Sequence, residues 1–215
     1  MLYMPRASTT PNAEFFDRNV PIRLQKALLR SLFESYKETS RYCWRHFQPP
    51  QAKDLSGTYR RAKIEDEWSG VAALVPDVVV GVRPYKNYTG SFNEITCGNV
   101  KITHSCVLSP DVVPRQAEFR ATLASNGQLQ MFSPNEPSTA IYLYAILTHG
   151  VDSDSPKRSR PAFALFQFPN EACTAYVDEG INLFRRFPDL VADYIEPSQA
   201  EAQVKHRRFK KPESA

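Results

Sequence analysis

The chain has 215 residues, 42% of them hydrophobic, which is enough for one sizeable core. Its formal net charge of +4 lies entirely beyond residue 204, where segment 205–211 carries five Lys and Arg and Glu213 is the sole acid. Residues 1–204 are formally neutral, which argues against bulk electrostatic attraction of the folded part to nucleic acid. The longest apolar run, Ala140 to Leu147, is less than half of the roughly 20 residues that a membrane-spanning helix needs, so no span is predicted.

The N-terminal residues lack a charged segment followed by an apolar stretch, so no secretory signal and a cytoplasmic location are predicted. The four cysteines have neither the density nor the spacing of a disulfide scaffold; they are Cys43, Cys97, Cys106 and Cys173. Cys97 and Cys106 would lie roughly 20 Å apart along a hairpin turning at Gly98 and Asn99, so these two should not pair.

Residues 1–20 are polar and contain prolines, which predicts an irregular arm. Between Pro21 and Phe47, apolar or small residues recur at steps of three and four and predict an amphipathic helix; they are Leu29, Phe33, Tyr36, Ser40, Cys43 and Phe47. Such a stripe can form a groove for a partner helix, but core packing is the more common role. Gln48, Pro49 and Pro50 are expected to end the helix.

From Thr58 to Phe168 the pattern predicts a sheet. Residues 60–63 are basic and 65–67 acidic, which favours a solvated strand edge over a phosphate site. Residues 78–82 predict a buried strand. Two-residue turns at Gly98-Asn99 and Asn126-Gly127 predict two hairpins.

Residues 141–148 and 162–168 are apolar on both faces, as expected for central strands or for a strand covered by a partner subunit. A homo-oligomer through strand 141–148 is therefore one hypothesis. The connection 151–161 is longer than an ordinary hairpin loop, which is typical of a functional loop or of a solvated excursion.

Asn170 predicts a helix N-cap, with Cys173, Val177, Phe184 and Phe187 on the inner face of the helix that follows. The predicted fold class is α+β: a mainly antiparallel sheet of about five to seven strands built from hairpins, with an N-terminal amphipathic helix and C-terminal helices packed on it. The predicted organisation is an arm over 1–20, a single domain over 21–196, and a basic, disordered tail over 197–215.

Motifs for nucleotide phosphate loops, zinc proteases, serine hydrolases and redox dithiols are absent, as are the Glu-x-Lys and Asp-x-Lys tripeptides of many metal-dependent nucleases. No cofactor and no metal are therefore predicted. Strand alternation places His104 on the core face opposite Asn93, where burial would lower its pKa. This fits a hydrogen-bonded structural histidine or a general base. His149 ends a central strand just before Gly150, a position at which strand ends often hold reactive side chains.

Arg115, Glu118 and Arg120 form a charged group beside the predicted sheet, which indicates an ion-pair cluster or an anion site. An enzyme hypothesis follows, in which His149 or His104 serves as base and Arg115, Arg120 or Arg158 steadies a phosphorane. It describes a metal-independent, ribonuclease-like enzyme.

The basic tail supports a different hypothesis, that of an interaction or accessory domain. Its basic residues could contact nucleic acid or an acidic protein through salt-dependent attraction, or could merely keep the chain soluble; they are Lys205, Arg207, Arg208, Lys210 and Lys211. The sequence leaves both functional hypotheses open.

Overall fold

The computed structural model describes residues 10–85, 90–127 and 142–195. Over these residues the helices are α1 (Pro11–Asn19), α2 (Ile22–His46), α3 (Pro49–Ala73), α4 (Glu118–Gly127), α5 (Leu183–Arg186) and α6 (Pro188–Ile195). The strands are β1 (Val78–Pro84), β2 (Ser91–Cys97), β3 (Val100–Cys106), β4 (Leu143–Val151), β5 (Pro161–Gln167) and β6 (Ile181–Asn182), and a 3-10 turn spans Pro156–Arg158. The chain thus has the predicted α+β class.

The six strands form one sheet in sequence order, β1 to β6. All neighbouring pairs are antiparallel except β3 and β4, which run parallel. The hairpin between β2 and β3 turns at Gly98 and Asn99 as predicted, with Cys97 opposite Val100 and Gly98 at a φ of 52°. The parallel pair brings the carboxyl ends of β3 and β4 to one end of the sheet.

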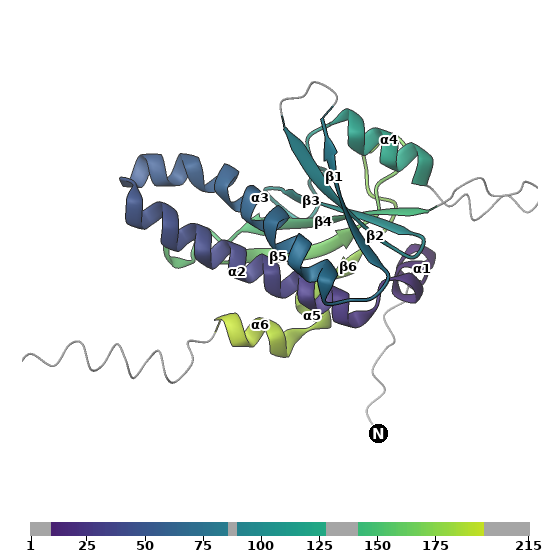
Figure 1. Cartoon of the computed structure of the whole chain (residues 1–215), viewed down its shortest axis with the longest axis horizontal. Coiled ribbons are helices and arrows are strands. Elements are labelled where there is room, and N and C mark those ends of the chain that lie inside the picture. Colours follow the sequence, from purple (N-terminus) through teal and green to yellow (C-terminus); the bar gives the residue numbers. More distant parts are fainter. Residues whose placement is uncertain (1–9, 86–89, 128–141, 196–215) are drawn as a thin grey trace, which may run out of the picture.

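Helices cover both faces of the sheet (Figure 1). On one face α1, α2 and α3 pack with the C-terminal helices over a large core that includes Phe16, Leu28 and Trp68. On the other face α4 covers a smaller core around Tyr144 and Ile146. Successive residues of β4 therefore alternate between the two cores, as strand geometry requires.

The first helical prediction is confirmed, because α2 occupies the expected segment and buries Leu29, Phe33, Tyr36 and Cys43. Core packing is the role of this stripe. The irregular arm predicted over 1–20 is wrong where the structure describes it: α1 begins after Thr10, whose hydroxyl accepts from the Ala13 amide. Phe16 of this helix is fully buried, 4.6 Å from the ring of Phe166.

The strand edge predicted over residues 60–63 is wrong, because these residues lie within α3. The first predicted helix does end before these prolines, since α2 stops at His46. Pro49 and Pro50 then start α3, which suits residues without a donor in the first turn. Its inner face is spaced by four and consists of Ala52, Ser56, Arg60, Ile64 and Trp68, all buried. The basic and acidic runs pair along the helix, with Arg61 3.0 Å from Glu65 and Lys63 3.0 Å from Glu67.

The hairpin predicted at Asn126 and Gly127 is also wrong, because both residues lie at the end of α4. The pair supplies a helix terminus here, a position at which glycine is equally favoured. The residues that would form the second strand of that hairpin, from 128 on, lie outside the described residues. The connection from β3 to β4 thus contains a helix and yields a parallel pair, not a second hairpin.

The helix predicted from Asn170 is wrong as well. Its side-chain oxygen accepts from the amides of Thr174 and Ala175 and closes a loop, and the helical residues begin only at Leu183. Asn182 provides the true N-cap by accepting from the amides of Phe184 and Arg185.

Strand 78–84 is formed but lies at the sheet edge, with Val79 and Val82 more than 60% exposed, so its predicted burial is wrong. Strand β4 is central, and helices of the same chain cover both its faces. Its apolar pattern therefore needs no partner subunit, and a homo-oligomer stays a prediction without that support. Among the described residues, no helix has the length and apolar character needed to cross a membrane.

Gly180 directly precedes β6, at a point where the backbone needs a glycine. It has a φ of 66°, and a Cβ at this position would lie 2.4 Å from the carbonyl oxygen of Phe166. Because positive φ and backbone contact both oppose a side chain, Gly180→Ala should lower the free energy of unfolding by about 2–3 kcal/mol in denaturant titration. Gly70→Ala is the control, since open space surrounds Gly70 in α3. An equal loss in both variants would contradict this account.

Candidate functional site

A cavity of about 240 Å³ opens where the carboxyl ends of β3 and β4 meet α3 and α4. We call it the arginine pocket, after Arg60 and Arg61 of α3 and Arg120 of α4, which line it. The last three residues of β3 and His149 of β4 also reach it. In mixed sheets, the carboxyl ends of parallel strands are a common place for a ligand site.

Two histidines far apart in the sequence touch in this pocket. Cys106 pairs with His149 across the parallel strands, so His104, two residues earlier, lies on the same face of the sheet. The Nδ1 atom of His104 lies 3.3 Å from Nε2 of His149, with nearly parallel rings. Neither histidine alone would suggest this pairing, which depends on the register of β3 against β4.

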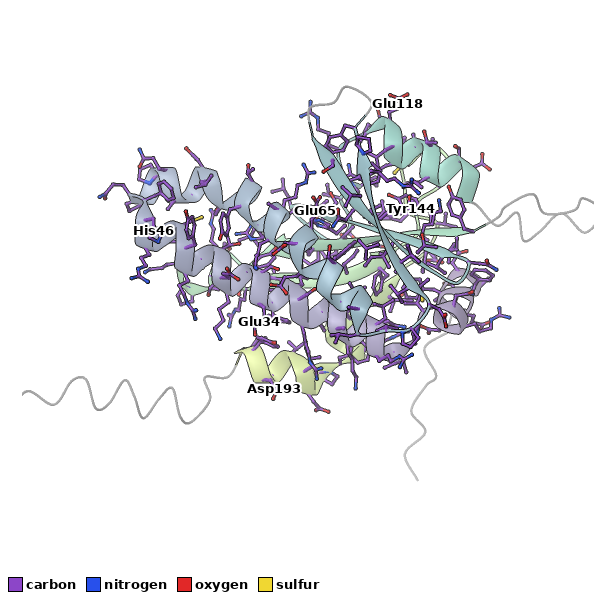
Figure 2. The ribbon with its side chains drawn as sticks, viewed as in Figure 1. Glu34, His46, Glu65, Glu118, Tyr144 and Asp193 are labelled. Atoms are coloured by element: carbon purple, nitrogen blue, oxygen red, sulfur yellow. The ribbon has the colours of Figure 1, made fainter. Side chains whose placement is uncertain are left out.

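The contact continues at both ends into a row of four side chains. The Tyr36 hydroxyl lies 2.8 Å from His149 Nδ1, and Glu65 Oε1 lies 3.8 Å from His104 Nε2. Figure 2 labels Glu65 on α3, beside the sheet. We call Tyr36, His149, His104 and Glu65 the imidazole row; it runs from α2 along one face of β4 and β3 to α3.

The imidazole row has two tautomeric arrangements without any charged imidazole, and only the first gives the ionised Glu65 carboxylate a donor from within the row. In the first, Tyr36 donates to His149, His149 Nε2 donates to His104, and His104 Nε2 donates toward Glu65. In the second, every proton is shifted and His104 Nε2 is an acceptor. The Tyr36 hydroxyl then needs another acceptor, and Cys106 Sγ lies 4.0 Å from it. A shift along the row thus switches His104 Nε2 between donor and acceptor.

Burial sets the charge of this row. Desolvation lowers the pKa of His104 from its ordinary value of 6.5, although the nearby Glu65 carboxylate acts in the opposite direction. Desolvation and the adjacent His104 lower the pKa of His149 well below 6.5. Burial raises the pKa of Tyr36 well above 10, so its hydroxyl stays protonated. Both imidazoles are therefore neutral near pH 7 and available as proton acceptors.

Glu65 supplies the negative charge in the pocket. Burial alone would raise the pKa of this carboxyl, but the contacts from His104 and Arg61 outweigh it and the net shift is downward. Glu65 is therefore ionised at neutral pH and pairs with Arg61 at 3.0 Å. Arg60 and Arg120 are left as positive charges that this carboxylate does not contact in any ion pair of the described residues.

These two arginines have hydrogen-bonding capacity to spare. Arg60 is only 4% exposed, with its guanidinium 4.2 Å from the centre of the Tyr36 ring. Arg120 donates to the Arg115 carbonyl and to Ser105 Oγ. The Nε atoms of both are buried and have no hydrogen-bond partner among the described residues. A buried cation with free donors is a good receptor for an oxyanion.

The structure thus brings His104, His149 and Arg120 into one pocket, as the enzyme hypothesis requires. Asn93, predicted opposite His104, donates to the Glu65 carbonyl. Arg115 contributes its carbonyl to Arg120, while Glu118 lies at the start of α4 (Figure 2). The predicted binding residues of the tail, from Lys205 to Lys211, lie outside the described residues.

Sequence reasoning missed Tyr36, Arg60 and Glu65. Tyr36 was assigned to the core, where it does lie, but its hydroxyl has a partner of chemical interest. Arg60 and Glu65 were assigned to a strand edge. In the sequence, only Ile64 and Trp68 mark the helical step of four in this segment, and no pattern indicates that Arg60 and Glu65 face a pocket.

In the described parts of the chain, no three His, Cys, Asp or Glu side chains are grouped so that they could hold a metal ion. All four cysteines are free thiols, in agreement with the prediction. Comparison with protein-family models, curated proteins and solved structures finds no match for this chain.

Proposed function

We propose that the chain is a ribonuclease-like enzyme that cleaves phosphodiesters without a metal, with His104 as general base and Arg60 and Arg120 as the oxyanion receptor. The observation that carries the proposal is the contact of the imidazole row with a pocket lined by Arg60 and Arg120, whose buried Nε atoms have no hydrogen-bond partner among the described residues. A neutral base beside unsatisfied cations is the arrangement that an anionic substrate with an ionisable hydroxyl requires.

The proposed reaction starts from the second arrangement of the row, in which His104 Nε2 carries no proton. The ribose 2′-oxygen forms a bond to phosphorus while its proton moves to that nitrogen. The bond from phosphorus to the 5′-oxygen breaks, and that oxygen takes a proton from water. The products are a 2′,3′-cyclic phosphate and a 5′-hydroxyl, and His104 then returns its proton to solvent. Glu65 stabilises the imidazolium formed on the way, because its carboxylate lies 3.8 Å from His104 Nε2.

The arginines act on the charge that develops on phosphorus. Arg60 of α3 and Arg120 of α4 both line the pocket. Planar guanidinium groups donate two parallel hydrogen bonds to a phosphate. Donors already in position at a developing charge contribute about 3–4 kcal/mol each in well-studied enzymes.

The geometry argues against one version of the mechanism. Two histidines on opposite sides of the phosphorus would have to be separated by the substrate, but His104 and His149 are in direct contact. His149 is 1% exposed and lies behind His104, between it and Tyr36. We therefore assign His149 as a positioning residue that fixes the tautomer of His104.

The test is cleavage of single-stranded RNA by the purified full chain in excess EDTA. We expect cleavage that depends on the chain and gives cyclic-phosphate ends, and equal activity after renewed chelation. If no cleavage is seen with a range of RNA sequences, or if Arg120→Met cleaves as well as the natural chain, the proposal is wrong.

The tail hypothesis remains a separate proposal, since its residues lie outside those described. Deletion of residues 205–215 should weaken binding of the chain to RNA at low salt by about tenfold, because fewer basic side chains then displace counterions from the phosphates. The melting temperature should not change. Filter retention measures RNA binding by the truncated and full chains. Equal binding by the two would show that the tail does not contribute to it.

A further inference from the structure

A second cavity of about 970 Å³ adjoins the arginine pocket. It lies between β1 to β3 and α4, and three aromatic residues line both cavities: Tyr85, Phe92 and Phe119. We call the larger cavity the aromatic groove. Its size falls within the range of ligand sites, and its shared wall means that one ligand can reach both spaces.

The shared wall is a cluster of rings with cations at its ends. The ring centres of Phe92 and Phe119 lie 3.9 Å apart, and Tyr85 stacks on Phe92 at 5.8 Å. The Arg61 guanidinium lies 5.3 Å from the Tyr85 ring centre, and Arg120 lies 4.8 Å from that of Phe119. The same two arginines line the arginine pocket, so the wall joins an aromatic surface to an anion receptor.

Charge is divided unequally between the two cavities. The groove cations Arg83 and Lys101 both contact Glu94, at 3.8 and 3.4 Å. The arginine pocket instead holds Arg60 and Arg120, with buried Nε atoms that lack partners among the described residues. A ligand that spans both spaces therefore places its anion in the pocket and a flat, uncharged group in the groove.

We propose that the aromatic groove is the base subsite of the enzyme, and that it takes the nucleobase next to the phosphate held by Arg60 and Arg120. A nucleobase has the required properties: it is planar and uncharged, it is joined to phosphate by a single ribose, and it stacks on aromatic and guanidinium planes. This inference rests on the proposed function for the identity of the anion, and it makes a nucleotide unit the recognised substrate.

The test is calorimetric binding to the full chain of adenosine 5′-monophosphate, ribose 5-phosphate and inorganic phosphate. Adenosine 5′-monophosphate should bind roughly tenfold more tightly than ribose 5-phosphate, because stacking of one base contributes a factor of roughly 5 to 150 in single-strand binding proteins. Tyr85→Leu should reduce the ratio to about twofold. Tyr59→Leu is the control, since Tyr59 stacks on Tyr42 outside both cavities.

The outcomes separate this inference from the proposed function. Base-dependent binding that is lost in Tyr85→Leu supports the subsite even if the chain cleaves no RNA. Equal binding of the two phosphate esters to the natural chain overturns the subsite and leaves the arginine pocket and its chemistry standing. If none of the three compounds binds, the subsite and the anion receptor are both wrong. If the Tyr85→Leu variant melts at a much lower temperature and cannot be used, the affinities of the natural chain still decide. The base subsite then stands or falls on whether adenosine 5′-monophosphate binds more tightly than ribose 5-phosphate.

Discussion

Replacement of His104 by glutamine should slow RNA cleavage by about 100-fold or more, because a positioned general base contributes at least that factor to a proton transfer. Glutamine has a similar length and can still contact Glu65 and His149, but it cannot accept a proton at neutral pH. The single-turnover rate in EDTA measures the effect. Since burial lowers the pKa of His104, the acid limb of the natural chain's pH–rate profile should lie below pH 6.5.

The matched control for His104 is His46→Gln, because His46 is exposed at the end of α2, away from the arginine pocket. Its cleavage rate should equal that of the natural chain. His149→Gln should lower the cleavage rate about tenfold and shift the acid limb of the pH–rate profile, as expected for a positioning residue. Full activity of a folded His104→Gln variant would eliminate the imidazole row as the source of catalysis.

The second large effect is a loss of stability between pH 7 and pH 5. His104 and His149 have lowered pKa values when folded and the ordinary value of 6.5 when unfolded. Below pH 6.5 the unfolded chain therefore binds protons that the folded chain does not, and stability falls as the pH falls. Each imidazole contributes at most about 1.4 kcal/mol per pH unit, so we expect a total loss of about 2–4 kcal/mol.

Denaturant titration at several pH values measures this loss. Glu65 also has a lowered pKa, but its contribution is lost only below the ordinary carboxyl value of 4.5, outside this interval. The free energy of unfolding of a His149→Gln variant should fall less between pH 7 and pH 5 than that of the natural chain, because the variant has one buried imidazole fewer. A natural chain whose stability is flat over that interval would show that the two imidazoles are not held neutral.

The sequence pattern predicted elements well where local signals and packing agree. The stripe of α2, the turn at Gly98 and Asn99, and the doubly apolar β4 each have a single simple structural solution. The errors have a common cause: each rests on a local sequence signal that is compatible with two kinds of secondary structure. Asn126-Gly127 suits a hairpin or a helix end, and the residues after Pro50 suit a strand edge or a charged helix.

The candidate site was predicted only in part for a different reason. Residue type and expected burial were enough to choose His104, His149 and Arg120 as candidates. That they lie in one pocket depends on the parallel pairing of β3 with β4, which are joined by a connection of 36 residues, 107–142. Glu65 and Arg60 reach the pocket only because α3 packs on the same face of the sheet. Contacts of such long range leave no periodic trace in a single sequence.

The central claim is that His104 and His149 form one neutral, coupled row. Nitrogen NMR of the imidazoles in the full chain, labelled at histidine, tests it most directly. Because one imidazole must donate to the other, we predict that both rings are neutral at pH 7.5 and carry the proton on the same type of nitrogen, Nε2 in both or Nδ1 in both. An imidazolium at that pH, or opposite tautomers in the two rings, would contradict the account.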